Sequence, residues 1–235
     1  MASRKEEKEQ RRQERLERER AEERAAQRRR RIKYSLLGLL ALAIIPAAIA
    51  VVTLVGSGGD DDASGRQASQ TDLPKLPEQQ EGDWKKAAES AGCKLTTAPY
   101  EGAGHAEKQF KPSDYKSNPP TSGAHFPQWY DDGIYLPGDT PELGKLVHTL
   151  EHGRINLQYR KGTSSAVTKK LEALTAEQND GYHLLLYENA TDMPYEVAAT
   201  AWTQMLGCER YTDKALDALR TFTARYIDKG PERVP

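Results

Sequence analysis

The sequence predicts an α+β domain, with helices on one face of a small sheet of about three strands, preceded by one transmembrane helix. Three observations lead to this prediction. An uncharged apolar run lies early in the chain, a Gly-, Asp- and Pro-rich stretch follows it, and the remainder alternates between helical and strand patterns. The order of those patterns is helix, strand, helix, strand, strand, helix, which is typical of a small sheet packed against helices.

Residues 1–33 form a basic, polar region. They contain fourteen Lys or Arg and eight Glu, a charge of +6, so the other 202 residues carry −7 of the net −1. A helix of this composition would be polar on all sides, so the composition predicts a solvated helix or a disordered tail. Nucleic-acid binding requires a dense basic face, so the acidic remainder argues against a nucleic-acid partner.

Residues 34–56 contain no charged side chain over 23 positions. As a helix they span about 34 Å, enough for a bilayer core of about 30 Å. A buried core helix and a cleaved signal peptide are the alternatives, and the length of the run and the region before it favour an uncleaved anchor. Basic residues 28–31 precede the run and Asp residues 60–62 follow it, so we expect a cytoplasmic N-terminus and an extracytoplasmic remainder at the cell membrane.

Residues 57–82 are rich in Gly, Ser, Asp, Gln and Pro and predict a flexible linker. The folded domain is expected over 83–235. It begins with a helix at 84–91, capped by Asp83 and closed by Gly92. Residues 97–139 lack periodicity, and an irregular segment this long usually carries function.

The remaining elements follow from caps and hydrophobic spacing. Thr140 and Pro141 begin a helix that Gly153 ends. The later expected elements are a half-buried strand at 154–159, a helix at 164–177, strands at 182–187 and 196–205, and a helix at 211–227.

Cys93 and Cys208 are the two cysteines of the chain. Two cysteines in an extracytoplasmic domain, where disulfides form and persist, predict one disulfide. Free or metal-bound thiols are the less favoured alternative. In the chain-entropy model such a bridge stabilises the fold by about 4–5 kcal/mol.

The densest chemical signal is the helix motif VHTLEHG at residues 147–153. His148 and His152 are four residues apart, so both imidazoles lie on one side of the helix. With Glu151 they spell HxxEH, the order of inverted zinc peptidases. However, Gly153 ends the helix at once and a strand follows, which is the wrong context for such a peptidase.

Two further histidines, His105 and His125, lie in the irregular segment before this helix, whereas His183 is expected to be a satisfied strand residue. The segments PPTSGAH (119–125), GIY (133–135) and LVHTLEHG (146–153), with Ala201 and Trp202 near Cys208, resemble the DUF3105 family. The resemblance covers about residues 83–230. It implies a bacterial, often membrane-anchored, extracytoplasmic protein and supplies no activity.

The positions that match the family's His-containing motifs are His125, His148, Glu151 and His152, with His105 a looser match. We expect His125, His148 and His152 to bind one metal ion, with His105 as a candidate fourth ligand; zinc and copper are the candidate ions because neutral imidazole suits both. Glu151 would be a ligand, an orienting residue or a base for metal-bound water. Alternatively, His148 and Glu151 pin the irregular segment through hydrogen bonds alone.

Three functions remain open. The first is a metal-binding module, the second a small metal-dependent hydrolase that uses Glu151 as its base, and the third a metal-free interaction domain of the cell envelope. The sequence does not decide whether the protein is an enzyme, nor does it give the substrate, the protein partner or the oligomeric state. Convergence of the imidazoles to within about 4 Å would favour the metal.

Overall fold

The structure is a computed structural model that describes residues 73–232. The predicted tail, the predicted span at 34–56 and most of the predicted linker lie outside the described residues. Within residues 73–232, none of the helices combines the length and the apolar character needed to cross a membrane. The membrane-spanning part of the predicted fold class therefore has no support in the structure.

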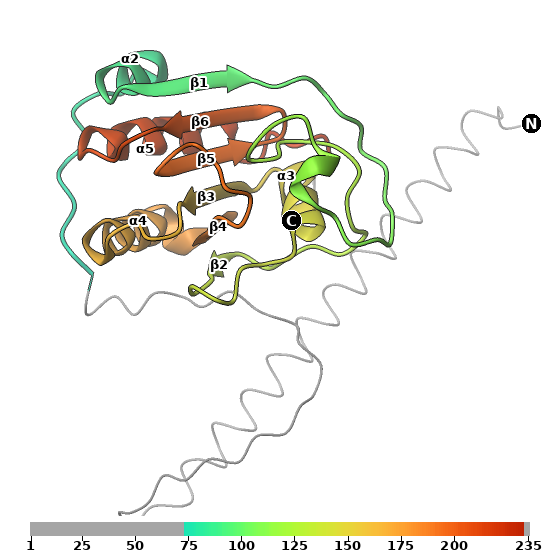
Figure 1. The fold of residues 1–235 in the computed structure, drawn as a ribbon. Coiled ribbons are helices and arrows are strands. Elements are labelled where there is room, and N and C mark those ends of the chain that lie inside the picture. The colour runs from blue at the N-terminus through green and yellow to red at the C-terminus, as the bar shows by residue number, and fades with distance from the viewer. Residues whose placement is uncertain (1–72, 233–235) are drawn as a thin grey trace, which may run out of the picture. The chain divides into compact units, whose positions relative to one another are not determined.

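The domain is built on a mixed sheet of six strands, so the prediction of about three strands is wrong. The sheet order is β1-β6-β5-β3-β4-β2 (Figure 1). Neighbours β3 and β4, and β4 and β2, are parallel, and the other pairs are antiparallel. The strands are β1 (Cys93–Thr97), β2 (Gly133–Ile134), β3 (Ile155–Tyr159), β4 (Leu184–Glu188), β5 (Val197–Ala201) and β6 (Gln204–Cys208).

The largest error concerns residues 196–205, which the sequence pattern presents as one strand. Residues 197–208 instead form the hairpin β5–β6, whose turn is Trp202 and Thr203 because Ala201 pairs with Gln204. Thr203 has a φ of 60°, which is unusual for a β-branched residue. No Gly, Asn or Pro marks this turn, so the sequence carries no turn signal there.

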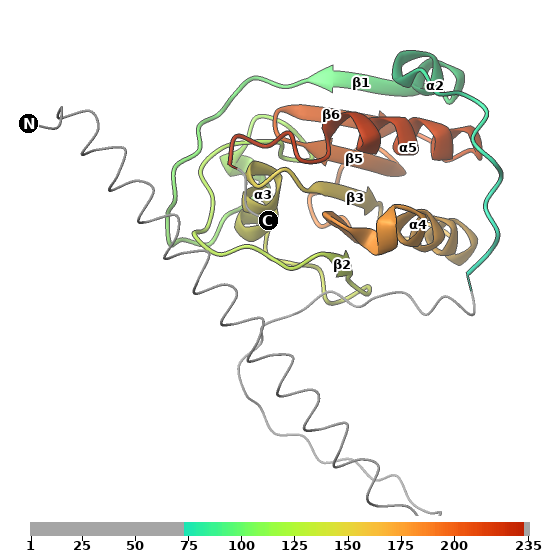
Figure 2. The same ribbon diagram turned by 180° about the vertical axis from the view of Figure 1, so that it is seen from behind.

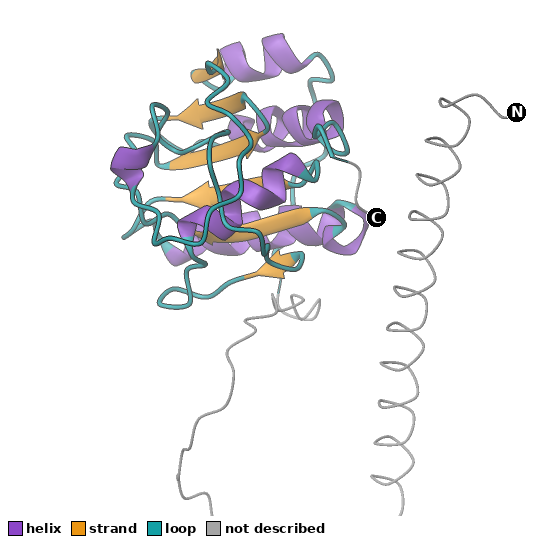
Figure 3. Cartoon of the chain, turned by 90° about the vertical axis from the view of Figure 1, so that its right-hand side faces the viewer, coloured by secondary structure: helices purple, strands orange, loops and turns teal. Residues whose placement is uncertain are grey.

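Four helices pack on the sheet: α2 (Trp84–Ser90), α3 (Leu143–Glu151), α4 (Ser165–Glu177) and α5 (Lys214–Tyr226). The predicted N-terminal cap is confirmed, since Asp83 accepts hydrogen bonds from the backbone N–H groups of Lys85 and Lys86. Figure 2 shows α4 and α5 on one side of the sheet, and Figure 3 shows the layers from the side.

The prediction that the helices share one face is also wrong, because α3 lies on the opposite face. Leu146 of α3 packs against Leu185, whereas α4 and α5 pack with Leu184 and Leu186. Adjacent strand residues point to opposite faces. The connections β2–α3–β3 and β3–α4–β4 run in opposite directions across the sheet. Parallel crossovers are almost always right-handed, so these two helices belong on opposite faces.

Both faces of the central strand β3 are therefore covered, and all five of its residues are buried, not half of them as predicted. Asn156 points toward α3, where its Nδ2 donates to the carbonyl oxygen of Leu146 at 3.0 Å and its Oδ1 accepts from Thr149. Gln158 donates to Oγ1 of Thr200 on β5. These hydrogen bonds satisfy polar groups that burial would otherwise penalise.

The predicted disulfide is confirmed. Cys93 and Cys208 are bonded and stand directly opposite each other on the edge pair β1–β6, with their Cα atoms 4.2 Å apart. Residues 76–81, which the sequence places in the linker, contact α5. Asp217 accepts from the backbone of Gln80 and Glu81, and Arg220 donates to the carbonyl oxygen of Pro77.

Candidate metal centre

Helix α3 presents two unlike sides. Leu146 and Val147 on its apolar side belong to hydrophobic clusters and Leu150 is fully buried, whereas His148 and Glu151 lie on the other side. His152 is the C-terminal cap residue, and Gly153 follows with a φ of +82° that ends the helix, as the sequence predicts. Three chemically active side chains are thus fixed within a turn and a half of helix.

The irregular segment before α3 brings two more histidines to the same place. His105 and His125 form a parallel bridge: the N–H of His125 donates to the carbonyl oxygen of Gly104, and the N–H of Ala106 donates to that of His125. The side chain of His125 is fully buried, whereas that of His105 is 45% exposed. The cluster therefore reaches solvent on its His105 side.

Four side chains converge to form what we call the inner group: His105, His125, His148 and Glu151. One ligand atom from each lies within 4.8 Å of the others. Two ligands of one ion, each about 2.1 Å from it, are at most about 4.2 Å apart. In a tetrahedral site the ligand atoms are about 3.4 Å apart, so any longer separation must shorten to hold an ion. His105, the exposed member, has room for that movement.

Hydrogen bonds fix the tautomers of two of these imidazoles. Nδ1 of His125 lies 2.8 Å from the carbonyl oxygen of Gly123, and Nδ1 of His148 lies 2.8 Å from that of Phe126. A carbonyl oxygen only accepts, so each Nδ1 carries the proton. Each Nε2 then keeps a lone pair, which is the arrangement found in metal-binding histidines.

Two buried atoms of the inner group have no hydrogen-bond partner among the described residues. They are Nε2 of His125 and Oε2 of Glu151, which lie 2.9 Å apart. Buried polar atoms are rarely left unpaired, so each such atom requires an explanation. An ion bound to both would satisfy them together.

Burial sets the charge state of the cluster. It lowers the pKa of His148 to about 4 and that of His152 to about 3, and it also lowers the pKa of His125. Burial raises the pKa of Glu151 to about 7, with a smaller contribution from Glu232. The imidazoles are neutral at pH 7 because their surroundings penalise charge, and neutral imidazole is the form that binds metals.

His152, which the sequence places in the same site as the other histidines, belongs to a neighbouring set. We call His148, His152 and Glu232 the outer group, and their ligand atoms also lie within 4.8 Å of one another. Trp129 contacts both imidazoles edge-on, with ring centroids 5.4 Å from His148 and 4.5 Å from His152. Sequence reasoning missed Glu232, which carries no motif and lies 80 residues after His152.

The fifth histidine lies outside both groups. Nδ1 of His183 is 2.6 Å from Oδ1 of Asp228, and its backbone N–H donates to Asp132. His183 directly precedes β4 and is buried. The expectation that it is a satisfied residue is confirmed.

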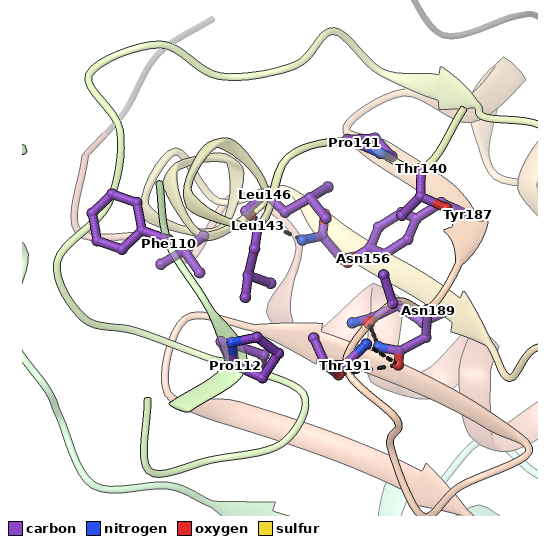
Figure 4. Close-up of a pocket in the computed structure, with 14 residues that line it drawn as sticks. Phe110, Pro112, Thr140, Pro141, Leu143, Leu146, Asn156, Tyr187, Asn189 and Thr191 are labelled. Carbon is purple, nitrogen blue, oxygen red and sulfur yellow. Dashed lines mark hydrogen bonds between the residues drawn. The ribbon is translucent and has the colours of Figure 1, made fainter. Parts of the chain in front are cut away.

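A pocket of about 170 Å³ lies on the apolar side of α3, away from the histidines. Figure 4 shows Leu143 and Leu146 on one side of it, with Asn189 and Thr191 across from them. Its lining contains no charged side chain and no member of either group. Substrate bound there would be separated from Glu151 by the helix itself.

The fold and the cluster define a disulfide-closed α+β domain with buried His and Glu groups whose geometry is compatible with a metal ion. Residues 105–234 match the family described as protein of unknown function (DUF3105), and the chain belongs to this family. The matched range contains every residue of the inner and outer groups. Searches of curated proteins and of solved structures find no match.

Proposed function

We propose that this domain is a metal-binding module that holds one transition metal ion in the inner group. The observation that carries the proposal is the pair of buried, unpaired atoms, Nε2 of His125 and Oε2 of Glu151, 2.9 Å apart. Nε2 of His148 and the imidazole of His105 complete four ligands around the same point.

The donor set indicates the class of ion. Three neutral imidazoles and one carboxylate suit borderline divalent ions, and four such ligands match the tetrahedral preference of zinc. Copper(II) binds nitrogen donors more tightly than zinc does, so the supply of each ion also decides which one is bound. Zinc and copper are therefore the ions to test.

The hydrolase alternative has less support. It requires a free base and an open coordination position beside a substrate cleft. Glu151 faces His125 as a ligand would, and it fills the fourth position of the inner group. The pocket lies on the other side of α3. A metal-free interaction domain, in turn, requires a protonated Glu151 to donate to Nε2 of His125, and it gives no function to the convergence of His105 and His148 on the same point.

The disulfide supports a location outside the cytoplasm, where such bonds form and persist. We propose an extracytoplasmic domain held at the cell membrane. The membrane attachment rests on the apolar sequence of residues 34–56 alone.

The test is elemental analysis of the full-length chain, purified in detergent, with titration calorimetry of zinc and copper. We expect one ion per wild-type chain and substantially less metal in His148→Ala, which removes a ligand common to both groups and leaves three in the inner group. His183→Ala is the matched control, since it removes an imidazole outside both groups. Equal metal content in wild type and His148→Ala would overturn the proposal.

A further inference from the structure

The outer group has the ligands of a second metal position. Nε2 of His152 lies 3.5 Å from Oε2 of Glu232, and the His148 and His152 rings have centroids 4.4 Å apart. Two imidazoles and one carboxylate form a common set for divalent transition ions. Glu232 is 53% exposed, so this position opens to solvent.

His152 is an unsatisfied histidine. Its side chain is 2% exposed, and Nδ1 is buried without a hydrogen-bond partner among residues 73–232. No hydrogen bond fixes its tautomer, in contrast to His125 and His148. Its ring is held by packing against Trp129. A buried imidazole whose Nδ1 has no hydrogen-bond partner among residues 73–232, and whose Nε2 faces a carboxylate, points to a ligand independently of the inner group.

The C-terminal segment 228–232 brings Glu232 to this place through backbone contacts. The N–H of Asp228 donates to the carbonyl oxygen of Gly153, and the N–H of Glu232 donates to that of Glu151. Gly230 packs so closely that a Cβ there would lie 2.1 Å from the carbonyl oxygen of Glu151. Glu232 is therefore held against the end of α3.

The two groups share His148, so His148 cannot bind an ion in each group at the same time. Nδ1 of His148 donates to the carbonyl oxygen of Phe126, which leaves only Nε2 as a ligand atom. One nitrogen lone pair serves one ion. An ion in the outer group has three protein ligands, one of them exposed, whereas the inner group offers four.

We infer that the outer group is an entry position for a hydrated divalent transition ion, and that His148 transfers this ion to the inner group. The ion keeps its bond to His148 while His152 and Glu232 are exchanged for His125, His105 and Glu151. The ion loses water as protein ligands replace it, and the proton of a protonated Glu151 goes to solvent, so the step is ligand exchange without a change of oxidation state. This inference rests on the proposed function.

Stopped-flow mixing with Co²⁺, whose visible absorption reports coordination, tests the route in the full-length chain. A residue that acts only on the route changes the rates of ion entry and ion exit by the same factor, because it does not change the affinity of the final site. In Glu232→Gln we expect the association and dissociation rates to fall together by about fivefold, with the Kd changing less than about twofold. Glu209→Gln, an exposed carboxylate after β6, is the matched control and should behave as wild type.

A second set of variants tests the outer position itself. His105→Ala/His125→Ala should still bind one Co²⁺, at least about tenfold more weakly, which is the usual size of a lost ligand contribution. Adding His152→Ala should abolish that binding. Circular dichroism and thermal unfolding of each variant establish that it is folded.

The outcomes separate this inference from the proposed function. If wild type binds no ion, both fail. If wild type binds one ion, two results together would overturn the inference alone. They are association and dissociation rates in Glu232→Gln that equal those of wild type, and no Co²⁺ binding by His105→Ala/His125→Ala. Two ions bound at once to the wild-type chain would also overturn it, because both positions require His148.

Discussion

Nε2 of His125 and Oε2 of Glu151 lie 2.9 Å apart in the interior of the domain, and neither has a hydrogen-bond partner among the described residues. Buried polar atoms without partners cost free energy unless a ligand satisfies them. Binding of an ion to both atoms should therefore stabilise the folded state.

The first prediction concerns thermal stability. An ion at 100 times its Kd adds about 2.7 kcal/mol to the free energy of unfolding. For a domain of this size, that raises the Tm by about 5–10 °C. Differential scanning fluorimetry with zinc, and then with excess EDTA, measures the shift. His148→Ala should show a substantially smaller shift, and an equal shift in that variant would mean that the ion acts elsewhere.

The second prediction concerns pH and the metal-free protein. Burial lowers the pKa of His148 to about 4 and of His152 to about 3, below the ordinary value of 6.5. The unfolded chain takes up protons below pH 6.5 while the folded chain does not. Stability is therefore present above that pH and is lost as pH falls toward the folded-state values.

Glu151 acts in the opposite direction. Burial raises its pKa to about 7, so its protonated form favours the fold at low pH and this contribution is lost as pH rises through 7. The buried imidazoles destabilise the fold as the pH falls, and they outnumber the one carboxyl group that stabilises it. We therefore expect the Tm, measured in EDTA, to decrease between pH 6.5 and 5. Glu151→Gln should steepen this loss. A Tm that rises over the same range would contradict the assignment.

The third prediction concerns the close contact at Gly230. In Gly230→Ala the added methyl group meets the carbonyl oxygen of Glu151, so segment 228–232 must shift. Overpacking of this kind costs about 1–3 kcal/mol. Urea unfolding measures the loss, and hydrogen exchange at the amides of Asp228 and Glu232 should accelerate.

The control for this contact is Gly82→Ala, because a Cβ at Gly82 meets nothing within 4 Å. It should leave both readouts unchanged. Gly230→Ala with wild-type stability and exchange would show that the segment is not held at this point.

The fourth prediction concerns the disulfide. Its two cysteines are 115 residues apart. In the chain-entropy model, the double variant Cys93→Ser/Cys208→Ser loses about 4–5 kcal/mol of unfolding free energy. Reducing agent should destabilise wild type by a similar amount and leave the variant unaffected. A double variant as stable as wild type would mean that β1 needs no covalent link to β6.

Local patterns in the sequence were sufficient to predict four features. They are the cap of α2, the C-terminal end of α3, the pairing of the two cysteines and the shared side of His148 and His152. Each depends on residues within one or two helical turns or, for the disulfide, on there being two cysteines. The period of a helix and the chemistry of its caps act over these short distances, so the sequence alone determines them.

Tertiary structure decided the remainder. His105 and His125 come from a segment without periodicity. A backbone bridge joins them to each other, and hydrogen bonds of the Phe126 backbone to Gly144 and His148 hold the segment against α3. β1 pairs with β6 across more than a hundred residues, and Glu232 reaches His152 because Gly230 permits close packing. Such contacts form when the free energy of packing offsets the entropy lost on closing long loops. A local sequence pattern does not predict this balance, because the contacting residues are far apart in the chain. The sequence thus determined which histidines have the chemistry of metal ligands, and the fold decided which side chains converge.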